Sequence, residues 1–95
     1  MYRIAWDFLP AAGRVPEFLA AYGADGDWVQ LFRRGDGYLG TELIPLADRP
    51  GWYRTVDRWE SAEAYATFRQ ARAAEYAALD AACEALTAQE LPCPS

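Results

Sequence analysis

The chain contains no histidine and no lysine, and these two absences restrict its chemistry most. Histidine is the commonest general base near neutral pH and the commonest protein ligand of metals. Neither a His-ligated haem nor a His-rich zinc site is therefore expected, and we predict no metal site. All nine basic residues are arginine, so no lysine is present to form a Schiff base with a carbonyl substrate.

Cysteine is scarce, and long apolar segments are missing. Cys83 and Cys93 are the only thiols, and two cysteines without further ligands form no metal motif. No segment approaches the ~20 apolar residues that a membrane span needs. We also predict no signal peptide, because Arg3 and Asp7 interrupt the first apolar run. The expected location is the reducing cytoplasm.

The net charge is −5, and the length is 95 residues. Nucleic acids and anionic membranes select basic surfaces, so neither is an expected partner. The length suits one domain, which we place at residues 1–90, followed by a C-terminal tail at 91–95. A domain this small buries a modest core, and a second copy of the chain would extend it.

Alternating apolar residues predict three strands, at residues 2–9, 38–46 and 52–59. Turn-forming residues between the second and third strands predict a hairpin. Large side chains occupy both faces of the third strand, whereas a sheet with one solvated face alternates apolar and polar residues. We therefore expect helices on one face and the sheet of a second subunit on the other. A fourth strand is expected to be missing or reduced to a few residues near 88–91.

Three helices are predicted, at residues 15–22, 28–34 and 61–86. Pro16 suits the first turn of the first helix, Asp27 is the expected cap of the second and Ser61 of the third. The last helix has a continuous apolar stripe that includes Phe68, Arg72 and Tyr76. The order β-α-α-β-β-α predicts a ferredoxin-like α+β fold with an antiparallel sheet.

Residues spread over 28–68 carry a resemblance to a known family: Trp28, Leu31, Phe32, Gly37, Tyr38, Thr41, Glu42, Leu43, Trp59, Ser61, Ala64 and Phe68. On these residues the chain resembles the antibiotic biosynthesis monooxygenase family of dimeric α+β barrels. The resemblance implies a homodimer and an oxidoreductase that oxidises a small aromatic or quinol, polyketide-like substrate with O2, without metal, flavin or other cofactor. The alternative is a non-catalytic dimeric module that binds a small molecule in a biosynthetic pathway. The haem-degrading branch of the family uses Asn, Trp and His where this chain has Trp6, Phe68 and Ala78, so haem degradation is not predicted.

Six residues are candidates for the site. Arg72 interrupts an apolar stripe, where an unpaired guanidinium is costly to bury. It would either hold an anionic oxygen of a substrate or extend to the edge and pair with a carboxylate such as Asp57. Tyr65 and Tyr76 are the candidate hydrogen-bonding partners in catalysis. The candidate substrate-binding residues Trp6, Phe32 and Phe68 would either line a slot for a flat ligand or fill the core. Asp7, Glu42 and Asp57 are strand carboxylates that could act as a base if desolvated. The alternative is that they face solvent or pair with an arginine on a neighbouring strand, here Arg3, Arg54 or Arg58.

Overall fold

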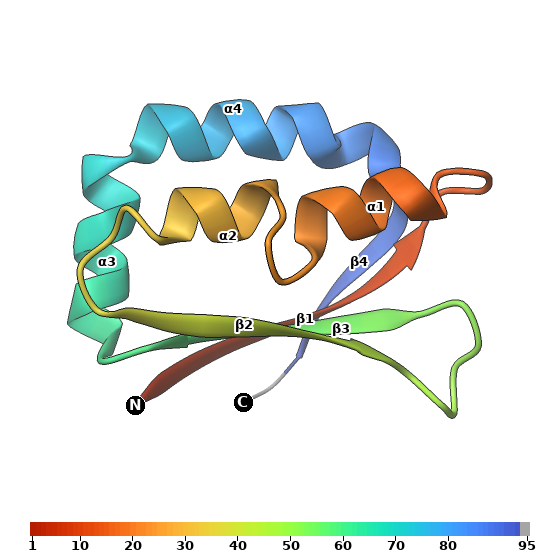
Figure 1. The fold of residues 1–95 in the computed structure, drawn as a ribbon, viewed down its shortest axis with the longest axis horizontal. Helices are drawn as coiled ribbons and strands as arrows, with labels where there is room; N and C mark the ends of the chain where they lie inside the picture. The colour runs from red at the N-terminus through yellow and green to blue at the C-terminus, as the bar shows by residue number, and fades with distance from the viewer. Residues whose placement is uncertain (94–95) are drawn as a thin grey trace.

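The computed structural model describes residues 1–93, which form one four-stranded antiparallel sheet with helices over one face (Figure 1). The strands are β1 (Tyr2–Pro10), β2 (Tyr38–Pro45), β3 (Tyr53–Trp59) and β4 (Thr87–Cys93), in the spatial order β2-β3-β1-β4. β2 and β3 form the predicted hairpin, and β1 pairs with β3 and β4. The predicted ferredoxin-like α+β fold is confirmed.

The helices are α1 (Val15–Tyr22), α2 (Asp27–Phe32), α3 (Ala62–Ala71) and α4 (Ala73–Cys83), and a 3₁₀ turn, η1 (Glu84–Leu86), leads into β4. In Figure 1, α1, α2 and α4 lie over one face of the sheet, and α3 stands at one end of it. Ser61 caps α3 as predicted, because its Oγ accepts a hydrogen bond from the Ala64 amide at 3.0 Å. The predicted Asp27 cap is wrong: Gly26 occupies the N-cap position of α2.

The single helix predicted over residues 61–86 is wrong, because it is broken at Arg72. The backbone of Arg72 (φ −116°, ψ 27°) lies outside the helical region and separates α3 from α4. Helices α3 and α4 run in different directions (Figure 1), and each packs a tyrosine against a different partner. The Tyr65 ring on α3 packs 5.5 Å from Trp59 on the sheet, whereas the Tyr76 ring on α4 packs 5.0 Å from Trp28 on α2. The alanine-rich sequence favours helix on both sides of Arg72. Residues 62–83 contain no glycine or proline, so the sequence does not mark the break.

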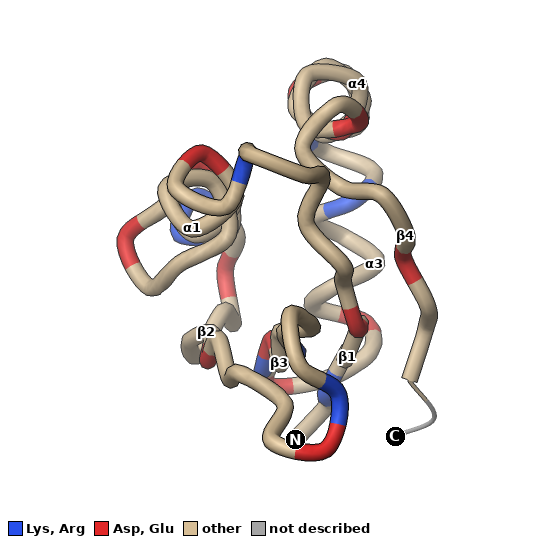
Figure 2. The backbone as a smooth tube through the Cα atoms, turned by 90° about the vertical axis from the view of Figure 1, so that its right-hand side faces the viewer, with Lys and Arg blue, Asp and Glu red and all other residues tan. Residues whose placement is uncertain are grey.

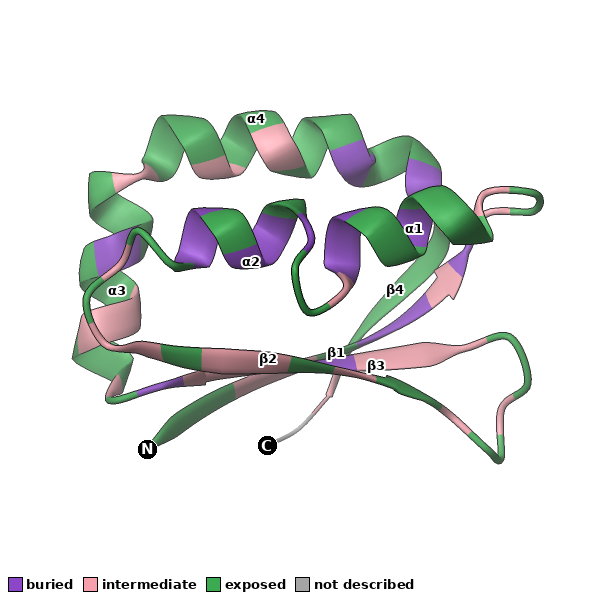
Figure 3. Cartoon of the chain, viewed as in Figure 1, coloured by how far each residue is buried: buried purple, intermediate pink, exposed green. Residues whose placement is uncertain are grey.

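Aromatic rings fill most of the space between the sheet and the helices. Trp59 and Phe18 are fully buried; the Trp59 ring lies 5.0 Å from Phe68, and the Phe18 ring stacks 4.7 Å from Tyr22. In Figure 3 much of α2 is buried, while much of α4 is exposed. The helical layer is therefore anchored mainly through α1, α2 and Phe68 in the second half of α3.

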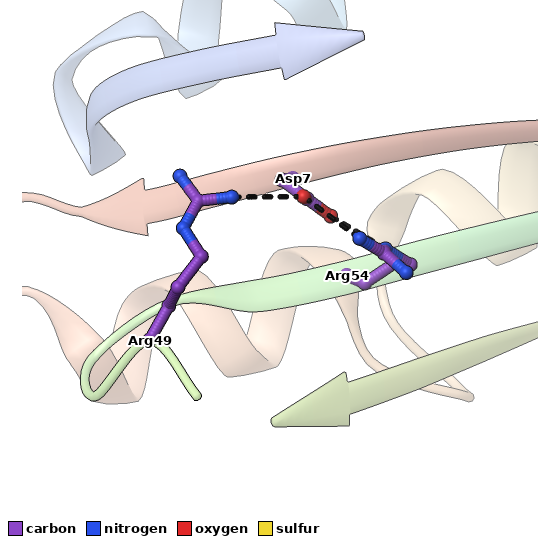
Figure 4. A network of polar contacts seen from close by, with 3 residues as sticks. All are labelled: Asp7, Arg49 and Arg54. Atoms are coloured by element: carbon purple, nitrogen blue, oxygen red, sulfur yellow. Dashed lines mark hydrogen bonds and ion pairs between the residues drawn. The ribbon is translucent and has the colours of Figure 1, made fainter. Parts of the chain in front are cut away.

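An ion-pair network lies on the opposite face of the sheet (Figure 4). Within residues 1–93 no helix covers that face, and Figure 2 shows α1 and α4 on the other side of β1, β2 and β3. Asp7 on β1 is only 4% exposed. Its carboxylate accepts two hydrogen bonds from Arg54 on β3, at 2.7 and 3.0 Å, and one from Arg49 in the β2–β3 loop at 3.2 Å. The Arg54 hydrogen bonds hold the pKa of Asp7 below its ordinary value against the opposing effect of burial. The Arg49 guanidinium in turn lies 4.0 Å above the Trp52 ring.

β4 is longer than the sequence predicted. It spans Thr87–Cys93 and pairs with β1 from Pro10↔Thr87 to Ala5↔Cys93. Residues 91–93, which the sequence assigned to a C-terminal tail, therefore belong to β4, where they are held by pairing with β1 and not by apolar alternation. Residues 94–95 lie outside the described part of the chain. Within residues 1–93, no helix is long and apolar enough to cross a membrane.

Candidate active site

A cavity of about 310 Å³ lies between the inner face of the sheet and the helices, with lining residues from the end of α1 and from α2, α3 and α4. This volume is at the lower end of the range of small-molecule sites. Half of its fourteen lining residues are aromatic: Trp6, Phe8, Tyr22, Trp28, Phe32, Tyr65 and Tyr76. Such a wall favours a flat, apolar ligand that can stack on the rings.

Regular spacing within each element brings the lining residues together. Residues at every second position of β1 point to the same face, so Ile4, Trp6 and Phe8 all line the cavity. Tyr65 and Arg69 are four residues apart on α3, and Tyr76 and Asp80 are four apart on α4. Residues at i and i+4 lie on one side of a helix, which places both pairs toward the same cavity.

Asp57 on β3 supplies a carboxyl group to the cavity wall. Its Oδ1 accepts a hydrogen bond of 2.7 Å from Thr41 Oγ1, which itself lies 2.6 Å from the Tyr38 hydroxyl. Burial raises the pKa of Asp57 to about 6, and the Thr41 hydrogen bond partly opposes this rise. A carboxyl group with a pKa this close to neutrality can accept a proton from a bound ligand and release it again.

Arg69 supplies the positive charge. Its guanidinium carbon lies 3.8 Å from the centre of the Tyr76 ring, and its Nη1 donates a 3.0 Å hydrogen bond to the Tyr65 hydroxyl. Stacking on one tyrosine and bonding to another fixes the guanidinium plane. Burial, followed by the neighbouring Tyr65, raises the pKa of Tyr76, so its hydroxyl stays protonated at neutral pH.

Exposed lining residues mark where the cavity meets solvent. Trp6 is 37% exposed, and Arg69, Asp80 and Glu90 are exposed as well. Phe8, Tyr22, Trp28 and Phe32 are buried. The charged groups therefore lie mainly at the mouth, while the interior is apolar apart from Asp57, Thr41 and Thr55.

Four of the six predicted site residues line this cavity: Trp6, Phe32, Tyr65 and Tyr76. Phe68 does not. It is 3% exposed and packs against Trp59 and Phe32, which is the core-filling alternative.

Arg72 also lies outside the cavity lining, which favours the structural alternative for this residue over a substrate contact. It occupies the break between α3 and α4, and its Nη1 donates to Glu75 Oε1 at 3.0 Å instead of pairing with Asp57. Arg69, one helical turn earlier, provides the cation that was expected of Arg72. The spacing of four residues between Tyr65 and Arg69 indicates that both lie on one side of the helix. A single unbroken helix would instead have placed Arg72 on that side.

The pairing of β2 with β3 brings the side chains of Tyr38, Thr41 and Asp57 together. Thr41 faces Asp57 directly across β2 and β3, and Tyr38 is paired with Trp59 just before a bulge in β2. The bulge shifts the register so that the Tyr38 hydroxyl reaches Thr41. Neither Thr41 nor Tyr38 was predicted as a site residue. Gly40, with a φ of 147°, marks the bulge in the sequence, but a glycine does not show which side chains the bulge brings together.

Solved structures with this architecture include proteins of known and unknown activity. A protein of Bordetella bronchiseptica provisionally named an antibiotic biosynthesis monooxygenase has 24% sequence identity and a TM-score of 0.73, with 96% of this chain and 88% of that chain covered. SnoaB, a cofactor-independent oxygenase of Streptomyces nogalater, has 20% identity and a TM-score of 0.71, covering 98% and 90%. The chain has the antibiotic biosynthesis monooxygenase fold.

A more distant structure with this fold is the haem degrader MhuD of Mycobacterium tuberculosis, solved with two haems in its active site. It has 21% identity and a TM-score of 0.54, covering 99% of this chain and 97% of that one. Comparison of the sequence with family models gives no match. Comparison with curated proteins gives none either. The similarity to these solved structures is therefore a similarity of fold, and evidence for a reaction comes from the residues of the cavity.

Proposed function

We propose that this protein is a cofactor-independent monooxygenase that oxidises a small aromatic phenol or quinol with O2. The observation that carries the proposal is the combination in one cavity of an aromatic wall, a partly desolvated carboxyl group at Asp57 and a fixed guanidinium at Arg69. The likeness in fold to SnoaB, a cofactor-independent oxygenase, supports the same reaction class.

In this proposal Asp57 is the general base. Direct oxidation of a phenol by O2 is easier from the phenolate, which is a better electron donor than the neutral phenol. Asp57 takes the hydroxyl proton, and its pKa of about 6 leaves it mostly ionised at neutral pH and still basic enough to accept that proton. The surrounding rings exclude water, which strengthens every electrostatic interaction of the anion that forms.

Arg69 and the two tyrosines hold that anion. The bond to Tyr65 uses one of the five guanidinium N–H donors, and the others are available to an anionic oxygen near the mouth. Tyr65 and Tyr76 position the guanidinium and contribute ring faces for stacking. Trp6 and Phe32 are the proposed substrate-binding rings, one at the rim and one in the interior.

The reaction balances with the substrate and O2 alone. The phenolate gives one electron to O2, and the resulting radical and superoxide combine at a ring carbon to form a hydroperoxide. The outer peroxide oxygen takes up the proton that Asp57 held. The ring carbon that bears the hydroperoxide then loses its hydrogen as a proton while the O–O bond breaks. Water is released and a quinone carbonyl remains, with one oxygen atom of O2 in the product and the other in water.

We further propose that the active protein is a homodimer joined through the uncovered face of the sheet. That face carries Ile44, 40% exposed, and Leu91, 43% exposed, beside the Asp7 network. A second copy would bury these apolar side chains, and interfaces of this kind in obligate dimers are large and apolar. Light scattering should give twice the 10.6 kDa of one chain. Ile44→Glu with Leu91→Glu should produce monomers, whereas Leu19→Glu, at a similarly exposed position on α1, should not.

The test of activity has two stages. A thermal-shift screen with flat phenols and quinols identifies ligands, and O2 consumption is then measured with each ligand that binds. We expect O2 uptake equal to quinone formed, strongly reduced in Asp57→Asn and in Arg69→Leu. Ligands that bind tightly without O2 uptake would contradict the enzyme proposal and favour the non-catalytic binding module instead.

A further inference from the structure

A chain of three hydroxyl and carboxyl groups leads from the edge strand to the cavity. The Tyr38 hydroxyl lies 2.6 Å from Thr41 Oγ1, and Thr41 Oγ1 lies 2.7 Å from Asp57 Oδ1. Tyr38 and Thr41 are on β2, and Asp57 faces Thr41 across the β2–β3 pair. The Tyr38 ring is held by packing, 5.3 Å from Trp59 and 5.6 Å from Phe32. Each member of the chain is thus fixed by an element of the core.

The direction of the hydrogen bonds follows from the number of hydrogens. A threonine hydroxyl has one hydrogen, and an ionised carboxylate can only accept. Thr41 therefore gives its hydrogen to Asp57, and Tyr38 must be the donor in the Tyr38–Thr41 bond. Accepting from Tyr38 in turn polarises the Thr41 hydroxyl and keeps it from rotating away, so the two bonds strengthen each other.

The chain also leaves the two oxygens of Asp57 in different situations. Oδ1 accepts from Thr41, whereas Oδ2 has no hydrogen-bond partner among residues 1–93. Asp57 lines the cavity, and Oδ2 is the oxygen that keeps its acceptor positions for a ligand there. A carboxylate fixed through one oxygen presents the other in a constant direction, which is what a base needs for proton transfer.

We propose that Tyr38 and Thr41 are positioning residues that together keep Asp57 ionised and aimed at the ligand, with Tyr38 acting only through the Thr41 hydroxyl. The inference rests on the proposed function for its meaning in catalysis, but the coupling of the three groups is a property of the folded protein without ligand. It follows that the ligand must offer a hydroxyl or another proton donor at its inner end, where Oδ2 receives it.

Other charged and titratable groups lie near Asp57 or Tyr38 on neighbouring elements. A comparison of variants has to leave these groups unchanged. β1 contributes only Ile4 opposite Asp57, and α2 contributes only aromatic rings to the cavity. The titratable groups that face the cavity from α1, α3, α4 and β4, together with the arginine whose charge acts on Tyr38, are Tyr22, Tyr65, Arg69, Tyr76, Asp80, Glu90 and Arg33. None of these is changed in the variants below.

The experiment is a ¹³C NMR titration of the Asp57 side-chain carboxyl in the protein without ligand. Thr41→Val keeps the shape of the side chain and removes its hydroxyl, and Tyr38→Phe keeps the packed ring and removes its hydroxyl. Hydrogen bonds to a charged group are strong enough that Thr41→Val should raise the titration midpoint of Asp57 by about one pH unit. Tyr38→Phe should raise it by a smaller, measurable amount. Tyr53→Phe, on the same face of β3, is the control and should leave it unchanged.

The double variant decides whether Tyr38 acts through Thr41. If it does, Tyr38→Phe with Thr41→Val should titrate as Thr41→Val alone does, because the intermediate hydroxyl is already gone. Equal midpoints in wild type and Tyr38→Phe, or additive shifts in the double variant, would overturn the inference. Because no turnover is measured, this failure is distinct from failure of the proposed oxygenase activity, which the O2 assay detects separately. An unchanged chemical-shift pattern in the core shows that each variant is folded.

Discussion

Replacing Asp57 with asparagine should stabilise the protein by an amount that grows as the pH rises. Burial raises the pKa of Asp57 from 3.8 to about 6, so the folded state binds this proton more tightly than the unfolded chain does. Between these two pH values the folded protein carries more protons, and its stability falls with rising pH. The destabilisation is complete above about pH 6.

The size of the effect follows from the same shift. A change in pKa from 3.8 to about 6 corresponds to roughly 3 kcal/mol, which is an upper value for a group that is not wholly buried. Asparagine keeps an oxygen that can accept from Thr41, and it removes the charge. For a domain of this length, ~2–3 kcal/mol corresponds to a rise in melting temperature of about 10 °C or more.

The assay is thermal denaturation of wild type and Asp57→Asn from pH 4 to pH 8, at one protein concentration so that any association is held constant. The difference between the two proteins should be small near pH 4 and largest above pH 7. Asp48→Asn, a substitution at an exposed position of the β2–β3 loop, should show a difference that does not depend on pH. A difference for Asp57→Asn that is equally independent of pH would refute the reasoning, since it would mean that Asp57 is not desolvated.

Three further outcomes are expected. Arg72→Leu should leave ligand binding unchanged and alter the free energy of unfolding in urea by less than about 1 kcal/mol, because it removes a partly exposed ion pair outside the cavity; a large loss of binding would contradict the assignment of the site cation to Arg69. Asp7→Asn should lower stability at neutral pH by about 1–3 kcal/mol. Since arginine contacts depress the pKa of Asp7, that loss should shrink as acid protonates the wild-type carboxyl, and an equal loss at pH 2 and pH 7 would argue against it. Gly35→Ala should destabilise the protein by about 1–3 kcal/mol, because the new Cβ would lie 2.9 Å from a ring carbon of Trp59; a wild-type urea midpoint would show that the core can shift there.

The sequence alone determined three of the four strands, the two short helices and the fold class. Alternation fixed the inner and outer faces of the strands, since successive residues of a strand point to opposite sides. Thus Trp6 and Asp57 lie on the helix-covered face, and Asp7 lies on the other, as the period of two requires. Local signals such as the Ser61 cap and the turn residues between β2 and β3 placed the element boundaries within a few residues. These are short-range properties, and they can be read without knowing what packs against what.

Tertiary structure decided which polar groups form the site. The break at Arg72 comes from the packing of Tyr65 on Trp59 and of Tyr76 on Trp28, which are contacts between distant parts of the chain. That break turned Arg72 outward to Glu75 and left Arg69 over the cavity. The seven-residue β4 also depends on pairing with β1, because its own sequence alternates too weakly to predict it. The chain from Tyr38 through Thr41 to Asp57 needs both a strand register and a bulge. Each of these features is a relation between segments far apart in sequence, and only folding establishes such relations.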